Sequence, residues 1–340
     1  MIRFAVVGQG HIGKRHAEMI RRNSEAQLVA VCDTLARTEL DGLADLKEPF
    51  YRSKDELLAK EQIDVVNICV PNGLHASLAL QALEAGCHVV IEKPMALSRL
   101  DAEKVIQKSE EVGKKVFCVM QNRYSPPSVW LKEMVESGRL GKLYMVQLNC
   151  FWNRDSRYYN AGTWHGSKEL DGGTLYTQFS HFVDIMYWLF GDVEHIYSVL
   201  EDYAHEKLTD FEDTGCISFH FKQGGMGCLH FSTAVWDCNL ESSMTIIAEN
   251  GSIKVAGQYM NEVTYCHVKD YVMPQLAPSN PPNDYGPYKG SAQNHHYVIQ
   301  NVIDVLSRQS EITTNAYDGM KVVDLIERFY EYAEETLILD

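Results

Sequence analysis

The sequence predicts an α/β protein with a doubly wound parallel sheet in its N-terminal part. The C-terminal part is predicted to be α+β, with an open sheet that is mostly antiparallel. Over the first third of the chain, short apolar runs alternate with helical stretches, which is the pattern of parallel strands joined by helices. After about residue 125 several strand-like runs follow one another without intervening helices, as in antiparallel sheets. A chain of 340 residues is also too long for one ordinary core, so we expect two domains, residues 1–122 and 123–340.

The overall composition narrows the classes of partner. The formal net charge is −15, with 31 Lys and Arg against 46 Asp and Glu, which argues against nucleic acid and against an anionic membrane surface. The nine cysteines include no CxxC pair, so we expect reduced thiols and no metal site. Neither a signal peptide nor an apolar run of about 18 residues is present, which predicts a cytoplasmic protein.

The N-terminus carries a dinucleotide-binding fingerprint. A predicted strand, residues 2–7, leads directly into Gly8-Gln9-Gly10-His11-Ile12-Gly13 and then into a helix. A second strand, residues 27–32, ends at Asp33. In a Rossmann fold the three glycines permit a tight turn and close approach to the pyrophosphate, which lies at the helix N-terminus. Asp33 would accept hydrogen bonds from the ribose and repel a 2′-phosphate, so NAD is predicted over NADP, a preference that the nearby Arg37 weakens.

Further strands and helices continue this alternation. We predict strands over residues 65–70, 89–91 and 116–120, and helices over 74–85 and 101–112 with Ser98 as N-cap. In doubly wound sheets ligands bind at the carboxyl ends of the strands. The polar and proline residues at or just beyond those ends are therefore candidates for the cofactor or substrate site: Pro71, Asn72, His75, Glu92, Lys93, Gln121, Asn122 and Arg123.

The C-terminal part is predicted to contain a sheet and three peripheral helices. Asn250-Gly251 predicts a hairpin, and the Pro- and Asn-rich residues 274–290 read as a long ordered loop, either a lid or a plain connector. The predicted strands are residues 143–152, 194–200, 214–221, 226–235, 243–248 and 252–255, and the predicted helices are 129–137, 292–306 and 316–335.

One segment of the C-terminal part contains candidate functional residues. Asp171-Gly172-Gly173 opens a predicted helix that runs to Leu189 and stops at Gly191. Thr177 and His181 lie four residues apart on it and would share a face. Taken alone, a histidine on an apolar helix is more often a core residue than a functional one.

The motifs together resemble the Gfo/Idh/MocA oxidoreductases. The glycine loop, Pro71 to His75, Glu92-Lys93-Pro94 and the segment ending in His181-Phe182-Val183-Asp184 occur in the family's order along essentially the whole chain. The resemblance implies an NAD-binding Rossmann domain and a C-terminal domain for substrate and oligomerisation, giving a homodimer or homotetramer. It also implies that Lys93 and His181 flank the hydroxyl that is oxidised, and that the Lys93–Pro94 bond is cis.

Within the family the chain is similar to UDP-N-acetylglucosaminuronate 3-dehydrogenases, which act in lipopolysaccharide sugar biosynthesis. This similarity implies substrate contacts from Lys93, Asn122, Arg123, Arg154, Trp164, Thr177 and His181. Two positions depart from the pattern. Thr177 stands where many inositol and glucose dehydrogenases carry Asp, and Met120 stands where the uronate enzymes carry Lys.

The chemistry requires a group that accepts a proton while hydride leaves the alcohol. Lys93 could do so, or could remain charged beside a developing alkoxide, and His181 can accept a proton near neutral pH. Glu92 would orient Lys93 or contact the cofactor. Guanidinium groups bind carboxylates and phosphates well, which makes Arg123, Arg154 and Arg157 candidates for an anionic sugar, while Tyr158, Tyr159 and Trp164 could stack on it or simply pack.

Two other functions remain open. One is an inositol or free aldose dehydrogenase of the same family. The other is a nicotinamide-binding regulator without catalysis, against which the presence of both Lys93 and His181 argues.

Overall fold

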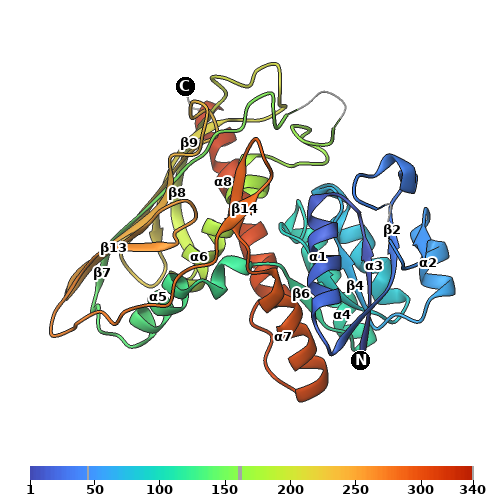
Figure 1. Ribbon diagram of the computed structural model, residues 1–340. Coiled ribbons are helices and arrows are strands. Elements are labelled where there is room, and N and C mark those ends of the chain that lie inside the picture. The colour runs from blue at the N-terminus through green and yellow to red at the C-terminus, as the bar shows by residue number, and fades with distance from the viewer. Residues whose placement is uncertain (44–45, 160–162, 339–340) are drawn as a thin grey trace. The chain divides into compact units, whose positions relative to one another are not determined.

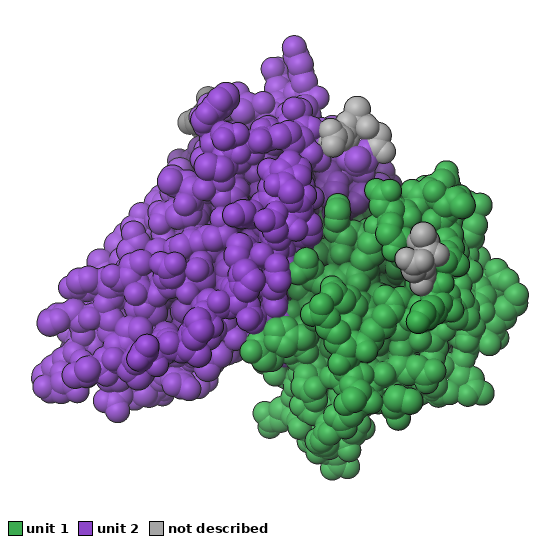
Figure 2. Space-filling model, viewed as in Figure 1, with its two compact units in different colours: residues 1–119, 295–323 green, residues 120–294, 324–340 purple. Residues whose placement is uncertain are grey.

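The two predicted sheets lie in separate units of the protein. The computed structural model describes residues 1–43, 46–159 and 163–338. Unit 1 comprises residues 1–119 and 295–323, and unit 2 comprises residues 120–294 and 324–340. Figure 2 colours unit 1 green and unit 2 purple.

Unit 1 contains a parallel sheet of six strands in the order β3-β2-β1-β4-β5-β6. Its central strands are almost wholly buried and rich in β-branched residues, as expected for a sheet covered on both faces. The strands are β1 (Ile2–Val7), β2 (Ala26–Cys32), β3 (Phe50–Tyr51), β4 (Val65–Ile68), β5 (His88–Ile91) and β6 (Val116–Cys118).

The helices of unit 1 include one from the far end of the chain. α7 (His295–Arg308) packs on α1 (His11–Arg22), as Figure 1 shows. The segment after α7 then borders β6, because Cys118 N–H donates to Thr314 O over 2.9 Å. The remaining helical elements are η1 (Arg37–Glu39), α2 (Lys54–Lys60), η2 (Asn72–Leu74), α3 (His75–Glu84) and α4 (Arg99–Val112).

Unit 2 contains a seven-stranded sheet in the order β13-β12-β11-β7-β10-β9-β8. All its strand pairs are antiparallel except β10 with β7. The strands are β7 (Leu143–Phe151), β8 (Val193–Glu201), β9 (Thr214–Phe221), β10 (Met226–Ser232), β11 (Glu241–Ala248), β12 (Gly251–Ala256) and β13 (Glu262–Val268), and β14 (Pro282–Asp284) forms a small hairpin with β15 (Lys289–Ala292).

Helices cover one face of this sheet. Trp152 packs edge-on against Phe182 of α6, and Phe219 stacks on Phe329 of α8. Along β9, buried and exposed residues alternate, which is the period of a sheet covered on one side. The helical elements are η3 (Gln121–Tyr124), α5 (Pro126–Glu136), the π-helical turn η4 (Leu175–Phe179), α6 (Ser180–Phe190) and α8 (Ala316–Ile338), which begins in unit 1.

The predicted fold class is confirmed, with several local differences. Among them, β3 and α2 were not predicted, and β14 and the start of β15 lie in the segment expected to be a loop. The hairpin between β11 and β12 pairs Ala248 with Gly251, so its turn residues are Glu249 and Asn250 rather than Asn250-Gly251. Gly251 serves a different purpose, since a Cβ there would lie 2.5 Å from His267 O on β13. β13 itself was not predicted, and the predicted helix after Gly173 begins as a π-helical turn.

All nine cysteines are free thiols. Cys32, Cys87 and Cys118 are buried in unit 1 and Cys150 in unit 2, whereas Cys216 and Cys238 are exposed.

Candidate active site

The glycine loop joins β1 to α1 and packs tightly on β4. A Cβ on Gly8 would lie 2.2 Å from Cys69 O, and a Cβ on Gly13 would lie 1.8 Å from Gly8 O. Gly8 also has a positive φ of 92°, which favours glycine. A Cβ on Gly10 would meet nothing within 4 Å. Two glycines are therefore required by packing, while Gly10, with the neighbouring His11 and Ile12, borders open space at the start of α1.

Asp33 lies beside this loop at the end of β2. Its carboxylate accepts hydrogen bonds from Gln9 N–H over 2.7 Å and from Leu35 N–H over 2.9 Å. The guanidinium of Arg37 donates to Leu43 O and Leu46 O. Arg37 therefore folds back on its own loop, and recognition of the ribose by Asp33 stays a prediction.

His75 links the ends of β4 and β5. One ring nitrogen lies 2.7 Å from Pro94 O and the other 2.8 Å from Val70 O. Burial lowers the pKa of His75, and the two carbonyl oxygens oppose this by favouring the protonated ring. The side chain thus fixes the backbone on which Lys93 stands, rather than facing open space. Pro71 and the buried Asn72 lie just beyond β4, and the Lys93–Pro94 bond is cis as expected.

Glu92 points into the interior of unit 1 and is 6% exposed. Its Oε1 lies 2.9 Å from His16 Nε2 and 3.5 Å from His295 Nε2. Burial raises the pKa of Glu92, but the hydrogen bond with His16 and the nearby ring of His295 outweigh it, and the net pKa lies well below the usual value. Half-buried Lys93 follows, and its N–H donates to Glu92 Oε2 over 3.2 Å.

His16, Glu92 and His295 also form the one group of potential metal ligands found in the described part of the chain. Asn67 Nδ2 lies 2.7 Å from His16 Nδ1. An amide nitrogen can only donate, so the proton of a neutral His16 is on Nε2. Both ring nitrogens of His16 are thus used in hydrogen bonds, and we assign the cluster to hydrogen bonding.

In unit 2, the predicted residues at the start of η3 belong to an amide network. Asn294 Nδ2 donates to Gln121 O and to Ser125 Oγ over 3.1 Å each. Asn122 Oδ1 accepts from Ala292 N–H over 3.4 Å. Gln121 Oε1 is buried, and no described residue donates to it, so a ligand amide or hydroxyl could satisfy it.

Arg123 is engaged in a buried ion pair. Its Nε lies 2.9 Å from Asp184 Oδ2 and its Nη2 lies 2.5 Å from Asp184 Oδ1, and both residues are at most 2% exposed. The guanidinium also lies over the Trp188 ring. The pair joins η3 to α6, which is a structural role, and any contact of Arg123 with a substrate remains a prediction.

Thr177 and His181 are both buried, at 8% and 3% exposure. Thr177 lies in η4 and donates its hydroxyl to the Asp171 carboxylate, which also accepts from Gly166 N–H over 2.8 Å. His181 follows at the start of α6. The π-helical turn between them means that the α-helical spacing predicted for this pair does not apply.

A second buried carboxyl group supports the glycine turn that precedes η4. Glu212 Oε1 accepts from Tyr330 Oη over 2.6 Å and from Thr174 N–H over 3.2 Å. Burial raises the pKa of Glu212 to about 8. A Cβ on Gly173 would lie 2.3 Å from Tyr330 Oη, so only glycine allows this close approach.

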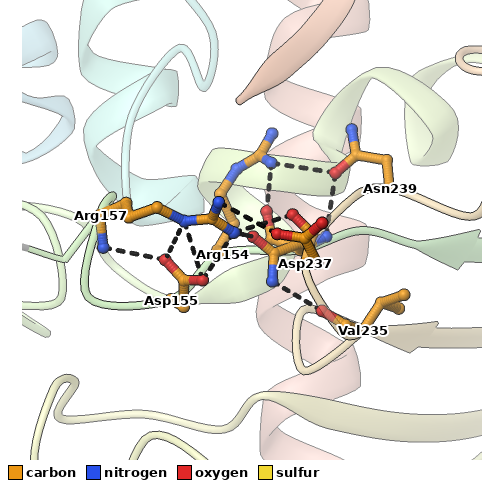
Figure 3. A network of polar contacts seen from close by, with 7 residues as sticks. Arg154, Asp155, Arg157, Val235, Asp237 and Asn239 are labelled. Atoms are coloured by element: carbon orange, nitrogen blue, oxygen red, sulfur yellow. Dashed lines mark hydrogen bonds and ion pairs between the residues drawn. The ribbon is translucent and has the colours of Figure 1, made fainter. Parts of the chain in front are cut away.

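Arg154 is a buried cation in an aromatic cage. It is 2% exposed and lies over the rings of Trp152, Tyr158 and Tyr288. Its hydrogen bonds go to neutral oxygens of Asn153, Gln178, Asn239 and Lys289, some of them visible in Figure 3. No carboxylate of a described residue forms an ion pair with it. Burial lowers the pKa of Arg154, as expected for a cation without a counter-ion.

Arg157 differs from Arg154 although it lies only three residues away. It is exposed and pairs with Asp155 and Asp237 (Figure 3). Trp164 is half-buried and stacks on His165 with ring centroids 4.0 Å apart, and Tyr158 and Tyr159 are buried.

Within each unit the structure brings several predicted residues together. Unit 1 groups the glycine loop with Asp33, and joins His75 to the backbone beside Lys93. In unit 2, the Thr177 hydroxyl donates to Asp171, which lies at the start of the segment that leads to His181. The sequence analysis missed His16, Asn67, Glu212 and His295, since a histidine on an amphipathic helix, an amide in a strand and an acid before a strand read as ordinary residues. Asp171 was part of a predicted segment, but no role was assigned to it.

Comparisons with known proteins identify the class of this chain. Residues 2–120 match the model of an oxidoreductase family with an NAD-binding Rossmann fold, and residues 129–254 match the C-terminal domain of the Gfo/Idh/MocA proteins. The WlbA dehydrogenase from Bordetella pertussis, solved in complex with NADH and UDP-GlcNAcA, is 32% identical with a TM-score of 0.86, and the match covers 98% of this chain and 97% of that one. The WlbA dehydrogenase from Chromobacterium violaceum, with the same two ligands, is 29% identical with a TM-score of 0.87 over 98% and 94% of the chains.

These matches define an oxidoreductase whose N-terminal domain binds NAD. The chain belongs to the Gfo/Idh/MocA family, and the predicted resemblance, enzyme class and cofactor are confirmed. A curated relative, inositol 2-dehydrogenase of Salmonella typhimurium, is 31% identical over 196 residues, which are 56% of this chain and 55% of that protein. The match thus spans about half the length of that relative. Among the described residues, no helix combines the length and apolar character needed to cross a membrane.

Proposed function

We propose that the protein is an NAD-dependent dehydrogenase that oxidises a secondary hydroxyl of an acidic, nucleotide-linked sugar such as UDP-GlcNAcA at C3. The observation that carries the acidic substrate is Arg154, a buried guanidinium without a carboxylate partner among the described residues. The two WlbA complexes support the same substrate class through likeness along nearly the whole chain. Residues 1–122 would hold NAD and residues 123–340 the sugar.

The arginine argument rests on charge balance. Burying a cation without a counter-ion is costly, and aromatic faces or neutral oxygens supply no net negative charge. The hydrogen bonds to Gln178, Asn153, Asn239 and Lys289 use four of the five guanidinium N–H groups. One donor is left for a ligand, and a carboxylate or phosphate would supply both an acceptor and the missing charge.

Lys93 and His181 are proposed to handle the proton of the oxidised hydroxyl. NAD⁺ held by the N-terminal domain would supply the hydride acceptor, and Lys93 or His181 would take the hydroxyl proton as the alcohol becomes a ketone. His75 and Glu92 would hold the backbone of Lys93 in place. Gln121 Oε1 would accept from a ligand amide or hydroxyl.

A substrate comparison tests the proposal. NADH formation is measured with UDP-GlcNAcA and, as a matched control, with UDP-N-acetylglucosamine, which lacks the carboxylate. We expect turnover of the uronate and little of the neutral sugar. Turnover of myo-inositol or glucose alone would favour the second candidate, which the similarity to inositol 2-dehydrogenase supports. If no sugar in the panel yields NADH while NAD still binds, the protein is a nicotinamide-binding regulator.

Variants locate the roles of individual residues. Lys93→Met and His181→Ala are each expected to slow single-turnover hydride transfer by at least about 100-fold, and near-wild-type rates in both would contradict the assignment. Arg154→Gln should raise KM for the uronate by about 10-fold or more, since a charge-assisted bond contributes about 1.5–3 kcal/mol. Arg157→Gln, an exposed and paired neighbour, is the control and should leave KM unchanged.

Two further expectations belong to this proposal. The sugar class places the reaction in lipopolysaccharide sugar biosynthesis, and the family resemblance implies a homodimer or homotetramer.

A further inference from the structure

A buried polar cluster in unit 1 includes Glu92, the residue before Lys93, whose carboxylate accepts from Lys93 N–H. It joins Glu92 at the end of β5 to His16 on α1, Asn67 on β4 and His295 at the start of α7. None of the four is more than 6% exposed. No water reaches such a cluster easily, so the charges inside it must balance through its own protons and through nearby charged groups.

The hydrogen bonds define the proton positions in the observed arrangement. Asn67 Nδ2 donates to His16 Nδ1 over 2.7 Å, and His16 Nε2 donates to Glu92 Oε1 over 2.9 Å. His16 is therefore neutral here and Glu92 is ionised. His295 Nε2, at 3.5 Å from Glu92 Oε1, forms a contact too long for a good hydrogen bond.

This arrangement leaves polar atoms without partners. Asn67 Oδ1 and both ring nitrogens of His295 are buried, and no described group forms a hydrogen bond with any of them. A buried polar atom without a partner costs about 1–3 kcal/mol. The cluster therefore has reason to adopt a second arrangement.

Rotation of the Asn67 amide generates that second arrangement. Oδ1 would then face His16 Nδ1, which would have to carry a proton to donate to it. His16 becomes an imidazolium paired with the Glu92 carboxylate, and Oδ1 gains a donor while Nδ2 gives up its acceptor, so the gain of this arrangement is the pairing of the Glu92 charge. The net charge of the cluster changes from −1 to 0, with every heavy atom close to its present position.

Other charged and titratable groups face the cluster from the surrounding elements. Burial lowers the pKa of His295, Glu92 opposes this shift, and His16 and Arg15 on α1 add to it. Burial also raises the pKa of Cys69, beyond β4, with Glu92 adding to the shift, and lowers that of His75 on α3, with Glu92 opposing it. Lys93 is the next residue along the chain, and its N–H donates to the Glu92 carboxylate.

We propose that His16, Asn67 and His295 are positioning residues that set the charge of Glu92 and, through it, the proton affinity of Lys93. When the cluster carries a negative charge, Lys93 retains its proton. When the cluster is neutral, Lys93 releases its proton more readily and can accept that of the substrate hydroxyl. The proposal rests on the role of Lys93 in the proposed function.

Two substitutions should shift the titration midpoint of Lys93 in opposite directions. Glu92→Gln removes the negative charge and is expected to lower the titration midpoint of Lys93 by about one pH unit. His16→Gln removes the group that can neutralise Glu92 and is expected to raise that midpoint by about one unit. General loosening of the structure would shift the Lys93 midpoint in the same direction in both variants. Opposite shifts therefore distinguish an effect of charge from an effect of structural disruption.

The measurement is an NMR titration of isotope-labelled lysine side chains in the full-length protein with NAD bound, with the Lys93 signal identified by its loss in Lys93→Arg. Opposite shifts support the proposal, whereas equal shifts or none overturn it. Because the titration needs no sugar, it is separate from the proposed function. If the Lys93 midpoint shifts as expected but no sugar is oxidised, only the proposed function fails.

Should a variant be too unstable to titrate, the wild-type protein still provides a test. The ring nitrogens of His16 are followed by NMR in the folded protein, and a proton found at Nδ1 supports the second arrangement. A ring that stays neutral down to the unfolding pH excludes it.

Discussion

Gly10 and Gly13 stand in the same loop, but the surroundings of the two residues differ. Gly13 touches the backbone of Gly8, so any side chain would displace the loop from β4. Gly10 has an ordinary extended conformation, with a φ of −68°, and open space before it. Gly13 is therefore required by the packing of the loop, and we expect Gly10 to approach the cofactor.

The first prediction follows from that contrast. Gly13→Ala is expected to lower the stability of the protein without NAD by about 1–3 kcal/mol through overpacking. Gly10→Ala, its matched control, should leave that stability unchanged but weaken NAD binding by about 10-fold or more, or about 1.4 kcal/mol. Thermal unfolding and NAD titration measure the two effects. Equal loss of stability in both variants would contradict the assignment.

Glu212 gives a prediction about pH. Its pKa in the folded protein is about 8, above the ordinary value of 4.5, so the fold favours the protonated carboxyl. The stabilisation is fully present below the unfolded-state pKa and is lost as the pH rises towards 8, at about 1.4 kcal/mol per pKa unit.

Glu212→Gln is neutral at every pH and keeps an acceptor for Tyr330. We expect it to be about as stable as the wild type near pH 5 and more stable by a few kcal/mol above about pH 8. Denaturant unfolding at both pH values measures this difference. The exposed Glu169→Gln is the control, and a parallel pH dependence of wild type and Glu212→Gln would refute the expectation.

At the scale of elements, the Arg123–Asp184 pair ties η3 to α6. Removing one member of a buried ion pair leaves the other charge without compensation and costs about 3–5 kcal/mol. Arg123→Met and Asp184→Asn should each destabilise by that amount, while the double variant should lose less than the sum of the two. A double-mutant cycle by denaturant unfolding measures the coupling. Additive losses would show that the pair acts through something other than mutual attraction.

Sequence patterns predicted most elements because each pattern reports a local property. The β-branched runs of β1 and β4 report burial on both faces, and Ser98 accepts from Asp101 N–H over 3.1 Å as an N-cap should. Patterns failed where the local structure depends on a segment that is distant in the sequence. Gly251 looked like a turn residue but serves the approach of β13, and the π-helical turn η4 depends on contacts from Asp171, Glu212 and Tyr330.

The candidate site shows the same limit. The positions of the glycine loop, Asp33 and Lys93 after strands could be predicted because each follows a short buried apolar run, while their roles stay predictions. The cluster that includes Glu92 could not be predicted, because His16 and His295 are separated by most of the chain and each has the appearance of a core residue. Nothing local signals that they face the same carboxylate.

At the scale of the whole molecule, unit 1 is assembled from both ends of the chain. α7 buries Val298, Ile299, Val302 and Ile303, and the segment after it borders β6. The predicted division at residue 122 is drawn from sequence, and the compact unit extends beyond it to residues 295–323.

A fragment of residues 1–122 should therefore lack a cooperative unfolding transition, because α1 and β6 lose their cover. Each apolar side chain left unburied forfeits about 1.5–3 kcal/mol at most. Joining residues 295–323 to the fragment through a flexible linker should restore cooperative unfolding and NAD binding. A cooperative transition in the fragment of residues 1–122 by itself would refute this expectation.

The outer face of the unit 2 sheet carries an apolar row. Met226, Met145 and Ile247 are neighbours in register across β10, β7 and β11, and Met226 and Ile247 are 48% and 42% exposed. If the protein is a homo-oligomer through this face, Met226→Lys with Ile247→Lys should lower the mass measured by light scattering and preserve NAD binding. Tyr203→Lys, in an exposed loop, is the control, and an unchanged mass in the lysine pair would place the interface elsewhere.

The reaction rates of the buried free thiols can report how often each unit opens. Burial raises the pKa of Cys32 to about 11, raises that of Cys87 and holds that of Cys150 well above the usual value, so these buried side chains stay unreactive until the surrounding structure opens. Cys32 and Cys87 belong to unit 1 and Cys150 to unit 2. The rate at which a thiol reagent labels each cysteine therefore times the opening of each unit separately, in the unmodified chain and with or without NAD.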